Sequence, residues 1–157
     1  MAQQLILLMR HAEKPEDPAD PNLSAAGLER AKALPARITP ILGGPLNCIF
    51  AAEKSNHSDR PVETVEPLSE ETGVEIDESF ADADYATLAA QLRSCALYAN
   101  ARIIICWHHE NIPAFAHDLG APPGVCPNPW PSTVFDLILK FEFSGQSSPE
   151  VTALRDT

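Results

Sequence analysis

The stretch LILLMRHAEKP, residues 5–15, governs the interpretation of the whole chain. It begins as an unbroken run of Leu, Ile and Met, which is typical of a strand buried on both faces. The run then stops on Arg10 and His11, a cation and an imidazole that are costly to bury without partners. Either these side chains lie at the mouth of a site that uses them, or the strand emerges into solvent there.

Apolar runs and amphipathic segments alternate along the chain. The expected strands are 5–9, 46–52, 102–107 and 133–143, with a weak strand or extended link at 74–80 and a short edge strand after residue 144. The expected helices run from an N-cap at Ser24 to near Pro35, over 61–72 before Gly73, over 84–99, and over 112–120. This alternation predicts an α/β fold, a three-layer α/β/α sandwich around a mostly parallel sheet.

The composition fits one globular domain that covers residues 1–157, with 45% hydrophobic and 21% charged residues. No apolar run approaches the roughly 20 residues of a membrane span. The start of the chain has neither the basic region nor the small-residue cleavage site of a signal peptide. We therefore expect a soluble cytoplasmic protein that does not bind membranes.

The net charge of −11 argues against nucleic acid as a partner, because no basic stripe is present to neutralise phosphates. An anionic substrate would have to be attracted by a local cluster of Arg and His against the field of the whole molecule. The cysteines show no CxxC spacing, and we expect buried free thiols: Cys48, Cys95, Cys106 and Cys126. The sequence leaves the oligomeric state open.

Basic side chains follow each of the three expected parallel strands. Arg10 and His11 end the first strand, a polar loop leads from the second to Arg60, and His108 and His109 end the third. Ligands of such sheets bind beyond the carboxyl ends of the strands. The convergence of these residues at one edge favours a site over simple emergence into solvent.

Arginines and imidazoles that share a pocket suit a phosphoryl group. Guanidinium groups bind its oxygens in a bidentate way, and a neutral His can attack phosphorus to form a phosphohistidine. A second, protonated His can stabilise the charge on the transferred group. Each residue taken alone is more often solvated or structural, but the set at one edge is hard to dismiss.

The chain resembles the histidine phosphatase superfamily, the phosphoglycerate-mutase-like enzymes. LMRHAE at 8–13 resembles its RHG/RHA signature, and NLSAAGLERA at 22–31 resembles a conserved helix of the family. The segments CIFAAEKSNHSDRPVETVEPL at 48–68 and RIIICWHHENIP at 102–113 resemble those that supply the pocket Arg and the second His. The motifs occur in the family's order and cover nearly the whole chain.

This resemblance implies roles for individual residues. His11 would be the nucleophile, while Arg10, Arg60 and a second His would bind and stabilise the phosphoryl group. Alignment of the Ile–Pro that follows places His108 at the catalytic position. His109 would then face away, because neighbours on an extended strand point to opposite sides, although a one-residue extension of the strand would reverse the two.

Family members often supply a general acid between the pocket Arg and the second His. In that segment the candidates are Glu78, Asp82 and Asp84, and Glu110 just past the histidines is another; none lies in a recognisable motif. A missing acid would suit a good leaving group such as phosphohistidine. We expect no metal site, because adjacent His ligands on a strand cannot both reach one ion, and no cofactor.

We therefore expect a phosphatase that acts through a phosphohistidine on His11. Its partner would be an anionic phosphorylated substrate, either a small phosphomonoester or a phosphorylated protein residue. Two alternatives stay open: a protein-phosphohistidine phosphatase that works without a general acid, and a catalytically weak phosphate-binding regulatory module. A phosphoglycerate mutase is less favoured, since the lid elements that retain a substrate are missing.

Overall fold

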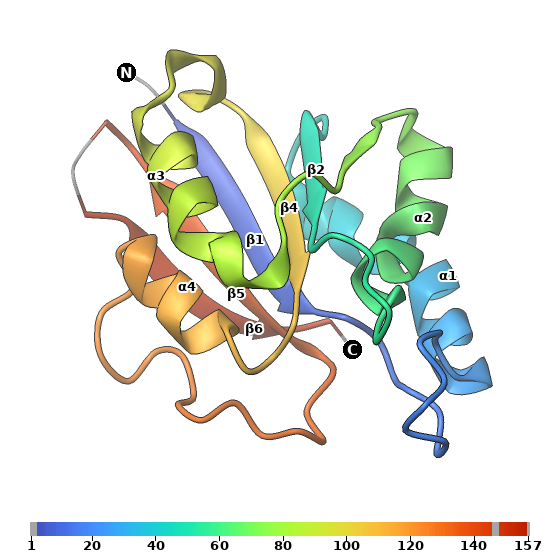
Figure 1. The fold of residues 1–157 in the computed structure, drawn as a ribbon. Coiled ribbons are helices and arrows are strands. Elements are labelled where there is room, and N and C mark those ends of the chain that lie inside the picture. Colours follow the sequence, from blue (N-terminus) through green and yellow to red (C-terminus); the bar gives the residue numbers. More distant parts are fainter. Residues whose placement is uncertain (1–2, 146–147, 157) are drawn as a thin grey trace.

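The computed structural model describes residues 3–145 and 148–156, and a single mixed sheet lies at its centre (Figure 1). The strand order is β3-β2-β4-β1-β5-β6. The strands are β1 Gln4–Arg10, β2 Cys48–Ala51, β3 Ile76–Asp77, β4 Arg102–Trp107, β5 Leu137–Phe143 and β6 Glu150–Arg155. The pairs β1–β4, β2–β4 and β2–β3 are parallel, whereas β5 pairs antiparallel with both β1 and β6.

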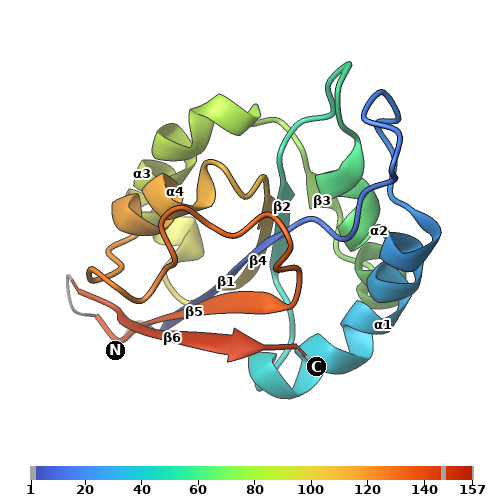
Figure 2. The same ribbon diagram turned by 90° about the horizontal axis from the view of Figure 1, so that it is seen from below.

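Two pairs of helices cover the two faces of the sheet. The helices are α1 Ala25–Leu42, α2 Arg60–Thr72, α3 Tyr85–Ser94 and α4 Ile112–Asp118. α1 and α2 lie together on one face, and α3 and α4 lie together on the other (Figures 1 and 2). The predicted three-layer α/β/α sandwich is confirmed. None of the helices in the described ranges is long and apolar enough to cross a membrane.

The alternation of side chains along β1 explains why its sequence is apolar from Leu5 to Met9. Leu7 and Met9 join the core under α1 and α2, whereas Ile6 and Leu8 join the core under α3 and α4. A strand that is covered on both faces has no position left for a polar residue. Polar side chains therefore stand only at the two ends of β1, Gln4 at its start and Arg10 at its end.

Helix α1 is longer than the sequence predicts. We expected it to stop near Pro35, but it continues through Pro35 and Pro40 to Leu42. The extra turns bury Ile38 and Leu42, and this burial offsets the backbone hydrogen bonds that the prolines remove. The helix ends at Gly43, whose φ of 65° is a left-handed conformation that favours glycine.

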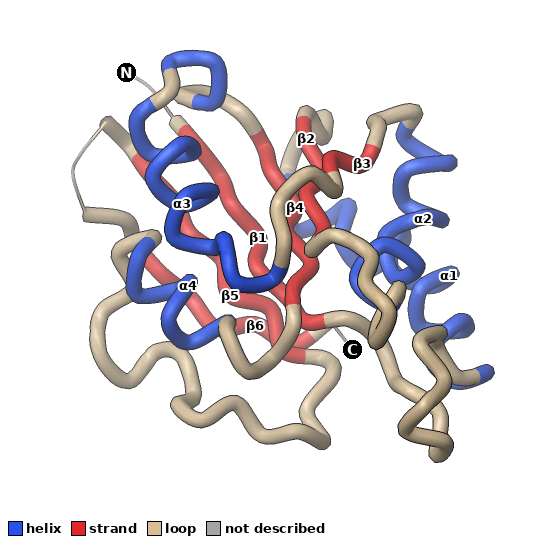
Figure 3. Tube along the Cα trace, viewed as in Figure 1, coloured by secondary structure: helices blue, strands red, loops and turns tan. Residues whose placement is uncertain are grey.

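Other element boundaries also differ from the expected ones. β5 begins at Leu137 rather than at residue 133, since its pairing with β1 ends at Met9 and Ile138, where β1 is about to leave the sheet. A loop of turns and irregular backbone therefore fills residues 119–136 (Figure 3). The helix expected over 84–99 ends at Ser94 and is followed by a short 3₁₀ turn.

The expected weak strand at 74–80 is reduced to β3, and β2 is shorter than the expected 46–52. The expected edge strand is present as β6. All four cysteines are free thiols, as predicted; Cys106 is buried, while the other three are half-buried.

Candidate active site

The carboxyl ends of β1 and β4 and the amino end of α2 meet at one edge of the sheet. Because β1 and β4 are paired in register, Arg10 lies beside Trp107, and the His11 N–H donates to the Trp107 carbonyl at 3.1 Å. The imidazole rings of His11 and His108 pack edge to face with centroids 5.5 Å apart. Together with Arg60 they line a cavity of about 480 Å³. The strand therefore ends in a site and does not emerge into solvent.

His11 is held as a neutral imidazole with one nitrogen free to react. Its side chain is buried, and its Nδ1 lies 2.7 Å from the Ala12 carbonyl. A carbonyl can only accept, so Nδ1 carries the proton and Nε2 keeps the lone pair. Burial lowers the pKa of His11 to about 3, and the positive charge of Arg10 acts in the same direction.

The backbone after His11 is fixed by the first turn of α2. The Ala12 N–H donates to Thr64 Oγ1 at 2.9 Å, and that hydroxyl donates to the Arg60 carbonyl at 2.7 Å. Glu13 forms an ion pair with Arg30 on α1, with Nε and Oε1 2.9 Å apart. Helices α1 and α2 thus both restrain the segment that carries the imidazole.

Close approach of α1 to this segment depends on Gly27. The Glu13 carbonyl accepts from the Ser24 N–H at 3.0 Å, just before the helix begins. A methyl group at Gly27 would lie only 2.3 Å from that carbonyl oxygen. Glycine is therefore required here for packing, and it fixes the distance between α1 and the loop that follows His11.

Two guanidinium nitrogens of Arg10 make no hydrogen bond to the described residues. Nη1 donates to the Ser132 carbonyl at 2.7 Å, and Cζ lies 4.0 Å from the centroid of the Phe135 ring. Nε and Nη2 are buried without a hydrogen-bond partner among the described residues. Burial lowers the pKa of Arg10 to about 10, so the group remains a cation at neutral pH. Unpaired buried donors of this kind are costly, and a bound anion would satisfy them.

Arg60 makes structural hydrogen bonds through its guanidinium, and it also lines the cavity. Its Nε donates to the Asn22 carbonyl at 3.1 Å, and Nη2 donates to the Asp20 carbonyl. These bonds hold the loop between β1 and α1 against the start of α2. Arg60 is buried yet lines the cavity beside His11, and its charge contributes to the lowering of the His11 pKa.

Both histidines after β4 line the cavity. The expectation that His109 faces away assumed an extended strand, but β4 ends at Trp107 and the chain turns, with the Asn111 N–H donating to the His108 carbonyl at 3.2 Å. His109 Nδ1 lies 3.3 Å from Glu110 Oε1, without hydrogen-bond geometry. Burial lowers the pKa of His108 and of His109, while the charge of Asp82 opposes this effect at His108.

The structure separates the four acidic candidates. Asp82 and Glu110 line the cavity, whereas Glu78 lines another cavity beside β2 and β3, and Asp84 lines neither. Asp82 is anchored because its carbonyl accepts from the Trp107 indole at 3.0 Å. Its Oδ1 is buried with no hydrogen-bond partner among the described residues.

Other polar residues that line the cavity were not selected from the sequence. They are Lys14, Glu53, Ser55, His57 and Ser58. They belong to no motif, but most of them follow the carboxyl end of β2, and the position of sites in parallel sheets could have indicated them. Within residues 3–145 and 148–156, no group of three or more His, Cys, Asp or Glu side chains is placed to hold a metal ion.

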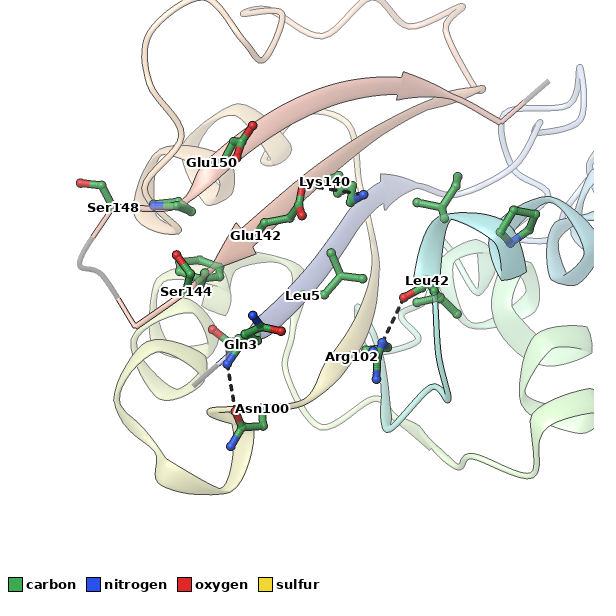
Figure 4. Close-up of a pocket in the computed structure, with 16 residues that line it drawn as sticks. Gln3, Leu5, Leu42, Asn100, Arg102, Lys140, Glu142, Ser144, Ser148 and Glu150 are labelled. Carbon is green, nitrogen blue, oxygen red and sulfur yellow. Dashed lines mark hydrogen bonds and ion pairs between the residues drawn. The ribbon is translucent and has the colours of Figure 1, made fainter. Parts of the chain in front are cut away.

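A larger groove lies at the opposite, amino-terminal edge of the strands (Figure 4). Its volume is about 930 Å³, and its cations have partners: Arg102 Nε donates to the Leu42 carbonyl at 3.0 Å, and Lys140 Nζ lies 3.7 Å from Glu142 Oε1. No histidine is among the described residues that line it. The groove lacks the nucleophile that the smaller cavity contains.

No protein-family model and no curated protein sequence matches the chain. Solved structures do. The protein histidine phosphatase SixA complexed with tungstate has a TM-score of 0.68 and 13% identity, with 97% of each chain covered. A phosphoglycerate mutase from Plasmodium falciparum has a TM-score of 0.64 and 14% identity, over 99% of this chain and 92% of that one.

A phosphoserine phosphatase mutant from Entamoeba histolytica, in complex with phosphoserine, has a TM-score of 0.57 and 12% identity, over 97% of this chain and 95% of that one. These likenesses extend over nearly the whole chain. They confirm the predicted phosphoglycerate-mutase-like fold.

Proposed function

We propose that this protein is a histidine-type phosphatase, a phosphoric monoester hydrolase that works through a phosphohistidine on His11. Two features of the same strand end carry the proposal: a buried neutral imidazole, and nitrogens of Arg10 that have no hydrogen-bond partner among the described residues. The resemblance of the sequence motifs and the likeness to SixA and to phosphoserine phosphatase in fold both support it.

In the first step, His11 Nε2 attacks the phosphorus of the ester. The new N–P bond forms as the bond between phosphorus and the ester oxygen breaks, and the electron pair leaves with that oxygen. Arg10, Arg60 and His108 hold the phosphoryl oxygens. The anion would counteract the burial that lowers the pKa of His108, so that this imidazole can donate to it as a cation.

A proton on the leaving oxygen would come from Asp82 or Glu110, the acidic candidates that line the cavity. In the second step, a water attacks phosphorus and gives a proton to the carboxylate that lost one in the first step; the N–P bond breaks, its electron pair returns to Nε2, and phosphate leaves with His11 restored to its neutral form. Replacement of Asp82 or Glu110 by its amide should slow hydrolysis of glycerol phosphate much more than that of p-nitrophenyl phosphate, whose leaving group needs no proton.

The substrate would be a small phosphomonoester or a phosphorylated protein residue. The likeness to a protein histidine phosphatase favours phosphohistidine within this range, and that substrate would need no general acid. We place the enzyme in the cytoplasm, where four free cysteines are stable. Residues 1–157 would act as one catalytic domain, since one sheet carries the whole site.

Turnover of p-nitrophenyl phosphate by the parent and by His11→Ala tests the proposal. We expect a loss on the order of 10³-fold or more, because the nucleophile is removed. His117→Ala is the matched control, since His117 is an exposed side chain on α4. Binding of vanadate without His11-dependent turnover would instead identify the phosphate-binding regulatory module.

A further inference from the structure

The loop between α4 and β5, residues 119–136, runs along the same edge of the sheet as the histidines (Figures 1 and 3). It belongs to none of the motifs that resemble the superfamily. Two of its residues nevertheless touch the basic residue at the end of β1. The Ser132 carbonyl accepts from Arg10 Nη1 at 2.7 Å, and the Phe135 ring covers the guanidinium with a distance of 4.0 Å from Cζ.

Phe135 lies against Arg10, the last residue of β1, and against His11, which follows it. Its ring centroid lies 6.5 Å from that of His11, so one half-buried ring packs against the cation and against the nucleophile. The face of an aromatic ring is electronegative and attracts a guanidinium that lies over it. The ring also takes the place of water beside Arg10.

The contacts of this loop restrict how Arg10 can turn. The Ser132 carbonyl holds one end of the guanidinium through Nη1, while the ring of Phe135 lies against it, 4.0 Å from Cζ. Nε and Nη2 are the nitrogens left without a partner among the described residues. The loop therefore leaves a bidentate pair of donors in a fixed orientation, the form in which Arg binds phosphoryl oxygens.

We propose that Phe135 is a positioning residue that orients Arg10 for the phosphoryl group, so that the loop of residues 119–136 completes the site. This inference rests on the proposed function for its substrate. Its direct consequence is a change in anion affinity, which can be measured even in a protein that turns nothing over. The two ideas can therefore fail separately.

The test compares two aromatic–arginine pairs of the same protein. Phe135→Met keeps an apolar side chain of similar size but removes the ring face, and Phe135→Tyr keeps the ring. Phe143→Met is the matched control, because the Phe143 ring lies 4.5 Å from Cζ of Arg93, away from the cavity. Vanadate affinity is measured by calorimetry, and KM and kcat for p-nitrophenyl phosphate are measured alongside.

We expect Phe135→Met to weaken vanadate binding about tenfold, and Phe135→Tyr to stay within about twofold of the parent. KM should rise in the Met variant more than kcat falls. Phe143→Met should leave vanadate affinity unchanged, even where it lowers the melting temperature. Equal affinity in Phe135→Met and the parent, or an equal loss in Phe143→Met, would overturn the proposal.

A second variant covers the case in which Phe135→Met does not fold. Site-specific incorporation of fluorinated phenylalanines at position 135 weakens the negative face of the ring at nearly constant volume. Vanadate affinity should decrease stepwise with the number of fluorines. A series without any trend would show that the ring acts only by packing and would overturn the positioning role. Failure of His11-dependent turnover in the parent, with this trend intact, would overturn the proposed function alone.

Discussion

The two edges of the sheet carry cations in opposite situations. At the amino edge, the larger groove holds Arg102 and Lys140, and a carbonyl and a carboxylate partner them (Figure 4). At the carboxyl edge, His11 lines the smaller cavity, and Arg10 directly before it is fully buried with two nitrogens that have no hydrogen-bond partner among the described residues. The two edges therefore differ less in the size of their cavities than in buried charge that has no partner among the described residues, which is costly unless a bound group offsets it.

The largest difference in activity should come from replacing one arginine at each edge of the sheet. Arg10→Lys keeps the charge but loses the planar pair of donors, and we expect kcat/KM for p-nitrophenyl phosphate to fall on the order of 10²-fold. Arg102→Lys should leave kcat/KM unchanged, since the side chain of Arg102 donates to the end of α1, at the opposite edge from the histidines. Steady-state kinetics of both variants provide the check, and equal effects would contradict the contrast between the edges.

Replacement of a glycine by alanine near each edge should show where the surrounding atoms can move to make room for a methyl group. At Gly27 it would meet the Glu13 carbonyl, whereas at Gly44 it would meet the guanidinium of Arg102 at 2.4 Å, which is the end of a flexible side chain. We expect Gly27→Ala to lower the free energy of unfolding by about 1–3 kcal/mol and to reduce activity, since α1 must shift away from the site loop. Urea unfolding should show a smaller change for Gly44→Ala; the reverse order would mean that the loop after His11 yields easily.

A fall in pH should lower the free energy of unfolding because of the buried histidines at the carboxyl edge. The pKa of His11 is lowered from an ordinary 6.5 to about 3. Between these two values the His11 imidazole is protonated in the unfolded chain and neutral in the folded chain. Stability from this group is complete above that range and declines by up to about 1.4 kcal/mol per pH unit as the pH falls toward the folded pKa. The lowered pKa of His108 acts in the same direction.

Urea unfolding at pH 7 and pH 5 compares the parent with His11→Gln. The variant should lose less stability between these two values, by about 1–2 kcal/mol, whereas the control His117→Gln should behave as the parent does. Identical losses in all three proteins would show that His11 is not the buried neutral group described above.

The smallest expected effect is on the preference between substrates whose ends beyond the phosphoryl group carry opposite charges. Glu53, Asp82 and Glu110 line the cavity, with Lys14 as their counterpart. We expect kcat/KM for phosphoethanolamine to exceed that for phosphoglycolate, an ester of similar size with the opposite terminal charge, by a factor of about 3–10. Glu53→Gln should reduce this ratio, and Glu150→Gln at the amino edge should not. A preference for phosphoglycolate would contradict the prediction.

The carboxyl edge was predictable because apolar runs fix where strands end. β1 and β4 are buried on both faces, so Arg10 and His108 stand out as the first polar residues after them. Parallel pairing then brings the strand ends together. The same reasoning fails for His109, because the backbone turns directly after Trp107 and the alternation of an extended strand no longer applies.

The contribution of Phe135 could not be predicted. The alternation of residues 133–143 suggested that it belonged to a strand, but β5 begins at Leu137. A loop without periodicity takes its conformation from tertiary contacts, here with Arg10, and these do not appear in local sequence. The length of α1 was missed for a related reason, since burial of Ile38 and Leu42 outweighs the local effect of Pro35.

Trapping of the phosphoenzyme tests the central claim most directly. The protein is mixed with a radiolabelled phosphodonor, stopped in alkali, and digested so that the labelled residue can be identified. The account predicts a phosphoryl group on His11 that survives alkali, is released by acid, and is absent from His11→Ala. Label on any other residue, or label that persists in His11→Ala, would contradict it.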